Sequence, residues 1–548
     1  MKYENYIFTG FGFAAGQYKI TNSDIENAIE SGNLQGLDKE RIEQSEEYQN
    51  FCKNNPNATV LKYFAGEIMG FKERYSVVPF PARKMGKTDN ETALELAVKA
   101  VQNTIKDAQI QPENIDAWFV STVSPHQQAP GIAASIKSFF QKKDNYSPTF
   151  STISGCAGFL INLEKAVNFL KTHENAKNVI VAHTETMSQF LTQRTKFVPF
   201  VTFGDLASAV MLSKKEDSEK YGIIDVCNFQ DVEMIDYVGV DAEFNLYTDD
   251  KKIKDRAIIN MPEAIEICLK NSGWKISNID KFIPHQTGNI IIKPTAEKIG
   301  ISPEKVYSYA QNYYGNVSGA TIPLSFTLLK LNNQLIDNQK IIAATAGVGG
   351  NYGAFSYISK QYSKTENFIC FKEDLKDKTV VLLCDDKDLE VFISNECKVR
   401  SAKVSHFNLQ KSEEILFSDS IYDYVIISLI KTNDNMRNYF YSIIENVNKL
   451  IQNKRIAEKI LIIGSSEEDS IHIKNEDYIS ACRALHGFFA SASGEFASYN
   501  IETLYLKIAP SFYEHSKINF AKDVVSHLYF QNILNYKHSY ENAMKISQ

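Results

Sequence analysis

Short apolar runs alternate with amphipathic stretches along most of the chain. Residues 117–123 (AWFVSTV) are typical of a buried strand, and residues 91–108 before them are typical of an amphipathic helix. The same order recurs at residues 178–182 (NVIVA), a strand-like run that follows another helical stretch. Regular alternation of strands and helices predicts an α/β protein.

Residues 20–70 depart from this pattern because they are polar, acidic and rich in asparagine. We expect them to form a helical surface insertion near the start of the first domain.

A second change falls near residues 363–371. The glycine-rich run 346–354 and the strand-like run 355–359 end one architecture, and new strand-like residues begin at 379–383 (TVVLL). What remains is long enough to fold by itself. We therefore predict a separate domain at 371–548.

The composition narrows the class of protein. The chain has 548 residues, too many for one ordinary core, and its net charge of −7 argues against nucleic acid as the main partner. No signal peptide and no apolar stretch long enough for a membrane span is evident. The eight cysteines are scattered without metal-ligand spacing, which favours a reduced cytoplasm and predicts no metal site.

Cys156 is the first candidate for chemistry. It lies in the sequence Ser-Gly-Cys-Ala-Gly-Phe (154–159), between a strand-like run and a helical pattern. A cysteine at a helix N-terminus is stabilised as the thiolate, the form that attacks carbonyl groups. The alternative is a buried structural cysteine, which is the commoner role of this residue type.

Three further motifs follow along the chain. His285 comes directly after a strand-like run, although a lone histidine is usually structural, and Asn316 lies in a turn that would cap a helix. The glycine-rich loop 347–353 has no following Lys-Ser/Thr pair, so a backbone donor to an oxyanion fits it better than a phosphate loop.

Together the motifs GCAGF, PHQTGN, YGNVSGATIPL and GVGGNYGA resemble those of the ketoacyl synthase III family of thiolase-fold condensing enzymes, over residues 3–360. The resemblance implies two similar α/β halves in an αβαβα arrangement, at 1–215 and 216–362. It also implies that Cys156 comes from the first half, that His285 and Asn316 come from the second, and that the protein is a homodimer.

The resemblance further implies a reaction. Cys156 would take an acyl group from a CoA or acyl-carrier-protein thioester, and a malonyl-type extender would lose CO2. His285 and Asn316 would donate hydrogen bonds to the resulting enolate, while the backbone N–H groups of Cys156 and of Val348 or Gly349 would bind the oxyanion. Two alternatives stay open: an acyltransferase that uses an alcohol, amine or thiol, and a scaffold without activity.

Three positions depart from the family pattern. Ile68 and Ile290 stand where relatives carry arginines that contact CoA or the carrier, and Ala129 stands where many carry a bulky residue that closes the acyl tunnel. A neutral loop difference would also explain Ala129. We expect a longer or broader acyl chain and a role in polyketide or specialised fatty-acid biosynthesis.

The C-terminal region resembles the ketoreductases of the short-chain dehydrogenase family, with Ser465 and Tyr478 at family positions. Cys482 replaces the expected lysine, and the first strand is followed by aspartates, without a glycine loop for a pyrophosphate. We therefore predict a Rossmann-like pseudo-ketoreductase domain that uses no NADPH or other cofactor. Residues 520–548 are expected to form one or two helices.

Overall fold

A computed structural model describes residues 2–34, 37–80, 91–141, 145–191, 197–241, 246–361, 378–384, 387–399, 402–406, 422–429, 445, 447, 456–465, 502–508 and 544–546. The chain divides into two units, Met1–Phe368 and Ile369–Gln548. Among the helices of these described residues, none is long and apolar enough to cross a membrane.

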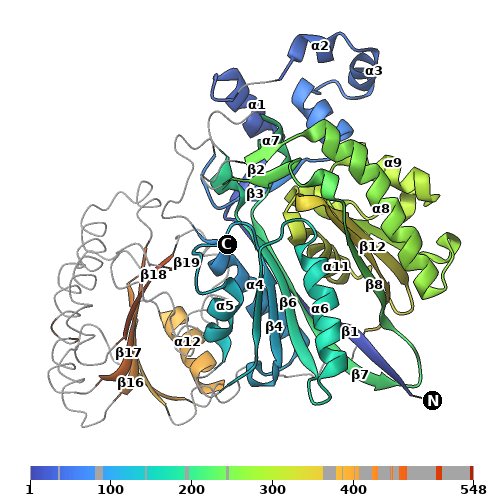
Figure 1. The fold of residues 1–548 in the computed structure, drawn as a ribbon. Helices are drawn as coiled ribbons and strands as arrows, with labels where there is room; N and C mark the ends of the chain where they lie inside the picture. Colours follow the sequence, from blue (N-terminus) through green and yellow to red (C-terminus); the bar gives the residue numbers. More distant parts are fainter. Residues whose placement is uncertain are drawn as a thin grey trace. The chain divides into compact units, whose positions relative to one another are not determined.

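The first half of unit 1 is built on one mixed sheet (Figure 1). In it β1 (Tyr3–Ala15) pairs antiparallel with β7 (Leu206–Asp217), and β7 pairs antiparallel with β6 (Asn178–Glu185). Parallel to β6 runs β4 (Ala117–Ser121), followed at the sheet edge by β5 (Thr149–Thr152).

The second half repeats this order of pairing. Here β8 (Gly222–Gln230) pairs antiparallel with β13 (Asn351–Ile358), β13 pairs antiparallel with β12 (Lys340–Ala346), and β12 runs parallel to β11 (Lys281–Pro284). A single pair, Tyr6 with Gly222, joins the halves into a nine-stranded sheet. The two similar α/β halves expected from the sequence are therefore present.

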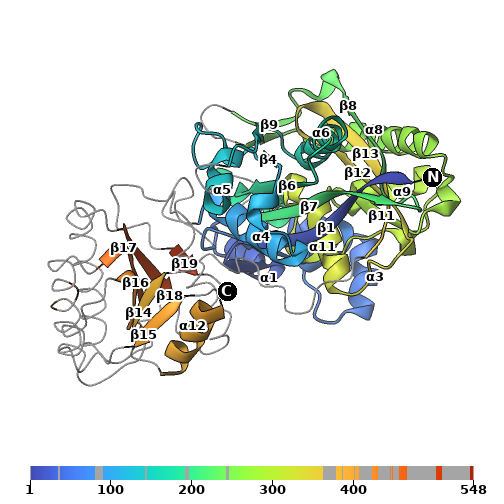
Figure 2. The ribbon, with the colours of Figure 1, turned by 90° about the horizontal axis from the view of Figure 1, so that it is seen from below.

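Helices form three layers around these sheets (Figures 1 and 2). The central layer holds α6 (Gly158–Thr172) and α11 (Thr321–Leu331), which contact strands of both halves. On the outer faces, α4 (Ala93–Ala108) covers β1, β6 and β7, and α8 (Asp250–Ser272) covers β8, β12 and β13. Outside residues 20–70, the other α-helices in the described part of unit 1 are α5 (Ile132–Phe140), α7 (Phe197–Thr202), α9 (Asn289–Ile299) and α10 (Tyr309–Tyr314).

Local sequence explains where these elements begin and end. α4 starts at a capping box, in which the Thr92 hydroxyl accepts from Glu95 N–H and the Glu95 carboxylate accepts from Thr92 N–H. It ends at Gln109, which adopts a left-handed conformation with φ 55°. α11 is buried along its first nine residues, which suits its apolar and hydroxyl side chains and its central position.

The insertion is helical, as predicted, but it is more than a surface feature. It contains α1 (Asn22–Glu30), α2 (Lys39–Glu43), α3 (Glu46–Asn54) and a π-helix (Lys62–Ile68). The antiparallel strands β2 (Tyr18–Thr21) and β3 (Glu73–Ser76) pair at its two ends. Ile25, Leu61, Ala65 and Phe71 form a small core there with residues of α7 such as Val201. The insertion is thereby fixed to the body of unit 1.

Arg74 also ties the insertion to α7 from inside the protein. Its buried guanidinium donates to the carbonyls of Val201 (3.0 Å) and Ile20 (3.3 Å) and to Asn22 Oδ1 (2.8 Å). Burial lowers the pKa of Arg74 to about 9. An arginine suits this position because its planar guanidinium has several N–H donors, which can reach three acceptors in different directions at once.

Unit 2 is built on a six-stranded parallel sheet. Its order is β15 (Lys403–His406), β14 (Thr379–Cys384), β16 (Tyr422–Leu429), β17 (Ile456–Ser465), β18 (Glu502–Ile508) and β19 (Met544–Ile546), and α12 (Lys387–Val399) follows β14. The helix prediction for 520–548 is wrong at β19, where pairing with β18 takes precedence over local pattern.

Candidate active site

A cavity of about 370 Å³ brings the three predicted residues together. Cys156, His285 and Asn316 all line it, although they lie 129 and 31 residues apart in sequence. Most of the other lining side chains are apolar: Phe64, Ile68, Met69, Val123, Met187, Val198, Phe203, Val240, Leu246, Ile253, Ile290, Ile291 and Val348. The cavity is thus an apolar chamber with a few polar groups around one thiol.

Cys156 lies in the turn between β5 and α6, and it is half-buried. Burial raises the pKa of this thiol, although hydrogen bonds from the Val348 N–H and the Ser318 hydroxyl act in the opposite direction. We expected the helix N-terminus to favour the thiolate. The backbone N–H of Cys156 does act in that direction, but loss of water outweighs it and the pKa of the thiol is raised.

Gly347 lies directly against the nucleophile. A side-chain carbon at this position would fall 2.2 Å from Cys156 Cβ and 2.8 Å from its sulfur, so glycine is required. The next residue, Val348, offers its N–H to that sulfur, whereas Gly349 is not among the lining residues. Of the two predicted oxyanion donors in this loop, Val348 is therefore the one that faces Cys156.

His285 follows β11 and is buried. Its backbone N–H donates to the Ala344 carbonyl (2.8 Å), and its Nδ1 lies 3.3 Å from Thr321 Oγ1. Burial, with a smaller contribution from His183, lowers the pKa of His285 to about 3. The imidazole is therefore neutral near pH 7.

Asn316 is held from both sides. Its backbone N–H donates to the Thr202 carbonyl (2.6 Å), and its Oδ1 accepts from Ser318 N–H (2.9 Å). Because the amide oxygen is engaged, the amide nitrogen is the atom available to a ligand in the cavity.

The two isoleucines that we expected at the positions of family arginines both lie in the cavity wall. Ile68 and Ile290 are each 37% exposed, as expected of residues at an opening. Among the described lining residues there is no lysine or arginine, and Asp250 is the one carboxylate.

Ala129 does not lie where we expected it. It is exposed in the loop between β4 and α5 and does not line the cavity of its own chain. The prediction that it forms part of this tunnel wall is wrong for a single chain, because the loop passes outside the chamber.

The structure also shows a buried polar network that we did not predict. His183 and Glu185 lie on β6 with 0% exposure, joined at 2.8 Å, next to Ser121 of β4. A histidine and a glutamate two residues apart on an otherwise apolar strand were the signal for it in the sequence.

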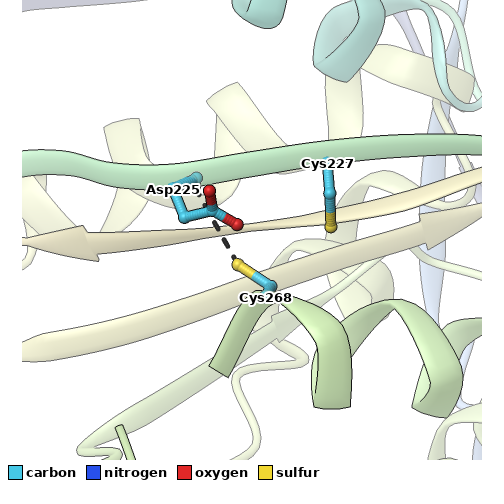
Figure 3. Close-up of side chains that lie close together, drawn as sticks. All are labelled: Asp225, Cys227 and Cys268. Carbon is cyan, nitrogen blue, oxygen red and sulfur yellow. Dashed lines mark hydrogen bonds between the residues drawn. The ribbon is translucent and has the colours of Figure 1, made fainter. Parts of the chain in front are cut away.

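One cluster has metal-ligand chemistry elsewhere in unit 1. Asp225 and Cys227 of β8 and Cys268 of α8 place one ligand atom each within 4.8 Å of the others (Figure 3). Cys227 contacts the carbonyls of Ala354 (3.5 Å) and Ala264 (3.6 Å), within an apolar cluster. Two thiols and one carboxylate are fewer than a tetrahedral zinc site needs, so we assign these groups to packing.

The structure describes one of the three predicted reductase positions. Ser465 ends β17, while Tyr478 and Cys482 lie outside the described residues.

Comparisons with known proteins point to one family. Residues 150–231 match the family model 3-oxoacyl-[acyl-carrier-protein] synthase III, and residues 269–357 match the model of its C-terminal region. The β-ketoacyl-[acyl-carrier-protein] synthase III of Clostridium acetobutylicum is 31% identical over 279 residues, covering 48% of this chain and 83% of that protein. The enzyme of Staphylococcus haemolyticus is 30% identical over 269 residues, covering 49% and 83%.

Solved structures give the same fold. The synthase III of Aquifex aeolicus aligns with a TM-score of 0.53 at 23% identity, over 65% of this chain and 100% of that one. The priming β-ketosynthase of the R1128 polyketide pathway aligns with a TM-score of 0.53 at 18% identity, over 65% and 97%. The residue ranges that match the two family models include Cys156, His285, Asn316 and Val348, and they do not include Ala129.

Proposed function

The chain belongs to the β-ketoacyl-[acyl-carrier-protein] synthase III family of condensing enzymes, and from this premise we propose that it performs a decarboxylative Claisen condensation. The Cys156 sulfur would attack an acyl thioester, release the donor thiol and hold the acyl group. A malonyl-type thioester would then lose CO2, and its carbanion would attack the acyl-cysteine to give a β-ketoacyl thioester and the free thiol.

The observation that carries this proposal is the meeting of Cys156, His285 and Asn316 in one apolar chamber. Thiol, imidazole and amide are the groups that acyl transfer and enolate stabilisation require. The Val348 N–H, next to the sulfur, would bind the oxyanion of each tetrahedral intermediate.

His285 would act as a neutral donor, since burial keeps the pKa of its ring well below its usual range. To donate from Nε2 the ring must keep its single proton there, so Nδ1 must accept from the Thr321 hydroxyl 3.3 Å away. That hydroxyl also lies 2.7 Å from the Ser318 carbonyl and 3.0 Å from Gln286 Oε1. Both oxygens can only accept, so they compete with Nδ1 for the single hydroxyl proton, and donation from Nε2 would require Thr321 to turn that proton towards the ring.

Condensation can be tested against simple acyl transfer. The protein would be incubated with an octanoyl thioester and malonyl-carrier, and CO2 and the β-keto product would be measured. Asn316→Ala should reduce decarboxylation about 100-fold, the loss expected for one oxyanion donor. Turnover to an alcohol, amine or thiol without extender, unaffected by Asn316→Ala, would support the acyltransferase alternative. No adduct at Cys156 would support a scaffold.

We propose that the acyl donor arrives on a carrier protein. Free CoA carries phosphates that need cationic partners, and the described lining residues include none at the opening near Ile68 and Ile290. Lys251, Lys252 and Lys254 are exposed on the first turns of α8, beside the lining residues Asp250 and Ile253. They would attract an acidic carrier.

Comparing thioesters would test this proposal. Octanoyl-CoA and octanoyl-pantetheine should acylate Cys156 at similar rates, since the CoA phosphates would gain nothing, and octanoyl-carrier should react faster. A strong preference for CoA would contradict it and would direct attention to Arg194 and Lys196, which lie outside the described residues.

A homodimer is also proposed. β5 is the edge strand of the nine-stranded sheet, and Phe150 and Ile153 beside that edge are 39% and 85% exposed. An unpaired strand edge with apolar side chains suits pairing with a second copy. Ile153→Glu should shift the protein from dimer to monomer in analytical ultracentrifugation, and a monomeric unaltered chain would contradict the proposal.

For unit 2 we propose a reductase-like domain without reductase chemistry. The parallel sheet is compatible with a Rossmann-like arrangement, and Cys482 stands where a reductase would need a lysine beside Tyr478. NADPH should give no binding signal in calorimetry.

We further propose that the product enters polyketide or specialised fatty-acid synthesis, since the apolar chamber suits a medium or long acyl chain.

A further inference from the structure

One short turn contacts every group of the candidate site. The turn Asn316–Thr321 contributes the Asn316 amide, places the Ser318 hydroxyl on the Cys156 sulfur, and places Thr321 Oγ1 3.3 Å from His285 Nδ1. Any movement of this turn would therefore disturb all three groups at once.

The turn is held in an uncommon conformation. Ser318 has φ 54°, in the left-handed region that side chains other than glycine rarely adopt. Such a backbone persists only where its surroundings fix it. The Asn316 Oδ1 bond to Ser318 N–H is one restraint, the Thr202 carbonyl holds the Asn316 N–H from outside the turn, and a further outside restraint acts next to Ser318.

The restraint next to Ser318 is His183. The Gly319 N–H donates to His183 Nε2 at 3.2 Å. A side-chain carbon at Gly319 would fall 2.5 Å from His183 Nδ1, so the turn rests directly on the ring. Both residues are buried, and the hydrogen bond is therefore shielded from water.

The ring is itself held on two sides. Its Nδ1 lies 2.7 Å from Ser121 Oγ, and its Nε2 lies 2.8 Å from Glu185 Oε1. Glu185 also accepts from the Val123 N–H (3.0 Å) and the Ser124 hydroxyl (2.6 Å). When Nε2 holds a proton, it donates that proton to the Glu185 carboxylate; when Nε2 has a lone pair that accepts from Gly319, the proton of the 2.8 Å contact must lie on Glu185 Oε1 instead. One proton therefore decides which contact is made.

We propose that His183, oriented by Ser121 and Glu185, is a positioning residue that holds the Asn316–Thr321 turn while Nε2 is unprotonated and releases it when Nε2 is protonated. The inference deepens the proposed condensation and rests on it for its consequence for turnover. Its consequence for the Cys156 thiol does not depend on any substrate.

The charges of this network reach the site. The carboxylate of Glu185 acts to raise the pKa of Cys156, and His183 acts to lower that of His285. These two site residues and Glu185 are the titratable groups that the described structure shows acting with His183. From β4 and the turn, the neighbours are the uncharged Ser121 and Gly319.

Two substitutions should therefore move the thiol in opposite directions. His183→Phe keeps a ring but removes the acceptor for Gly319, so Ser318 should lose its hold on the sulfur and the thiol should titrate about one pH unit higher. Glu185→Gln removes the negative charge and the preferred acceptor of the Nε2 proton, so the thiol should titrate lower. His183→Gln retains an acceptor and should lie close to the unaltered protein.

The measurement is the pH profile of iodoacetamide alkylation of the full chain, followed by mass on the peptide that contains Cys156. Acylation by octanoyl-pantetheine is measured in parallel and should fall about tenfold in His183→Phe, the loss expected when one hydrogen bond to the reacting group is broken. Ser213→Ala, which removes a buried hydroxyl at the opposite end of β6 and β7, is the matched control and should change neither.

Opposite shifts of the alkylation midpoint would support the proposal even if no acyl-enzyme forms, which would count against the condensation instead. The proposal is overturned if His183→Phe leaves the midpoint and acylation unchanged. It is also overturned if both variants shift the midpoint in the same direction with equal losses of thermal stability, because a purely structural role would act in that way. Should His183→Phe fail to fold, a downward shift in Glu185→Gln supports the proposal and no shift overturns it.

Discussion

At the scale of single residues, the reactivity of Cys156 is set by two opposed effects. Burial disfavours the charged thiolate, and the Val348 N–H and Ser318 hydroxyl favour it. The sequence motif identified Cys156 but did not predict this balance. The local sequence around Cys156 shows neither how deeply the thiol is buried nor that Ser318, 162 positions later, approaches it.

Alkylation of Cys156 should therefore be slow at neutral pH. Since burial raises its pKa above the ordinary thiol value, the thiolate fraction and the rate should rise about tenfold per pH unit to beyond pH 9. Ser318→Ala should move this profile about one unit higher, because a hydrogen bond to the sulfur is lost. A plateau reached below pH 8 would contradict the expectation. Iodoacetamide trapping, followed on the Cys156 peptide, is the measurement.

Decarboxylation should be insensitive to pH on its acid side. With a pKa of about 3, His285 stays neutral throughout the range from pH 5 to 7.5. A histidine with an ordinary pKa near 6.5 would be only about 3% neutral at pH 5 and would lose about 30-fold in rate. CO2 release from a malonyl thioester measured across this range distinguishes the two, and His285→Ala supplies the baseline.

At the scale of elements, the insertion and the first turns of α8 both contribute residues to the cavity wall. The insertion contributes Phe64, Ile68 and Met69 to the cavity wall. A helical segment at residues 20–70 was predicted from its polar, acidic and asparagine-rich composition. Its role in the wall was not, because that depends on Arg74 and on packing against α7.

Removing the buried guanidinium should loosen the insertion. Arg74→Met leaves three buried acceptors without donors and should lower the free energy of unfolding of unit 1 by about 3 kcal/mol. Arg74→Lys should be intermediate, because one ammonium cannot replace a planar fork. Denaturant unfolding followed by fluorescence measures both. Equal stability of all three proteins would contradict the assigned role.

Charge reversal on α8 should weaken use of a carrier. Lys251→Glu with Lys252→Glu should lower kcat/KM for octanoyl-carrier about tenfold at low salt, and less at high salt where the attraction is screened. Acylation by octanoyl-pantetheine should be unchanged. Lys270→Glu, near the other end of the same helix, is the matched control, and an equal effect on both donors would contradict docking at this surface.

At the scale of the whole molecule, the lining residues of the cavity all belong to the unit Met1–Phe368. The α/β class and the strands near residues 117 and 178 were predictable because hydrophobic residues recur with different periods in strands and in helices. So were the two similar halves, through the resemblance. The exposed position of Ala129 was not, because loop paths depend on tertiary contacts rather than local pattern.

A chain ending at Phe368 should form acyl-Cys156 at a rate within about threefold of the full chain, since a unit with its own core can fold alone. Intact mass after exposure to octanoyl-pantetheine gives the rate. Loss of acylation in a soluble, folded fragment would show that unit 2 is needed for the reaction.

The walls of the chamber have two origins. Its floor is formed by residues at strand ends and their turns, with Cys156 and Gly347 in contact, whereas Phe64, Ile68 and Met69 come from the π-helix and the residue that follows it. A change confined to Phe64, Ile68 or Met69 would therefore alter which acyl groups fit the chamber without touching the residues beside the sulfur.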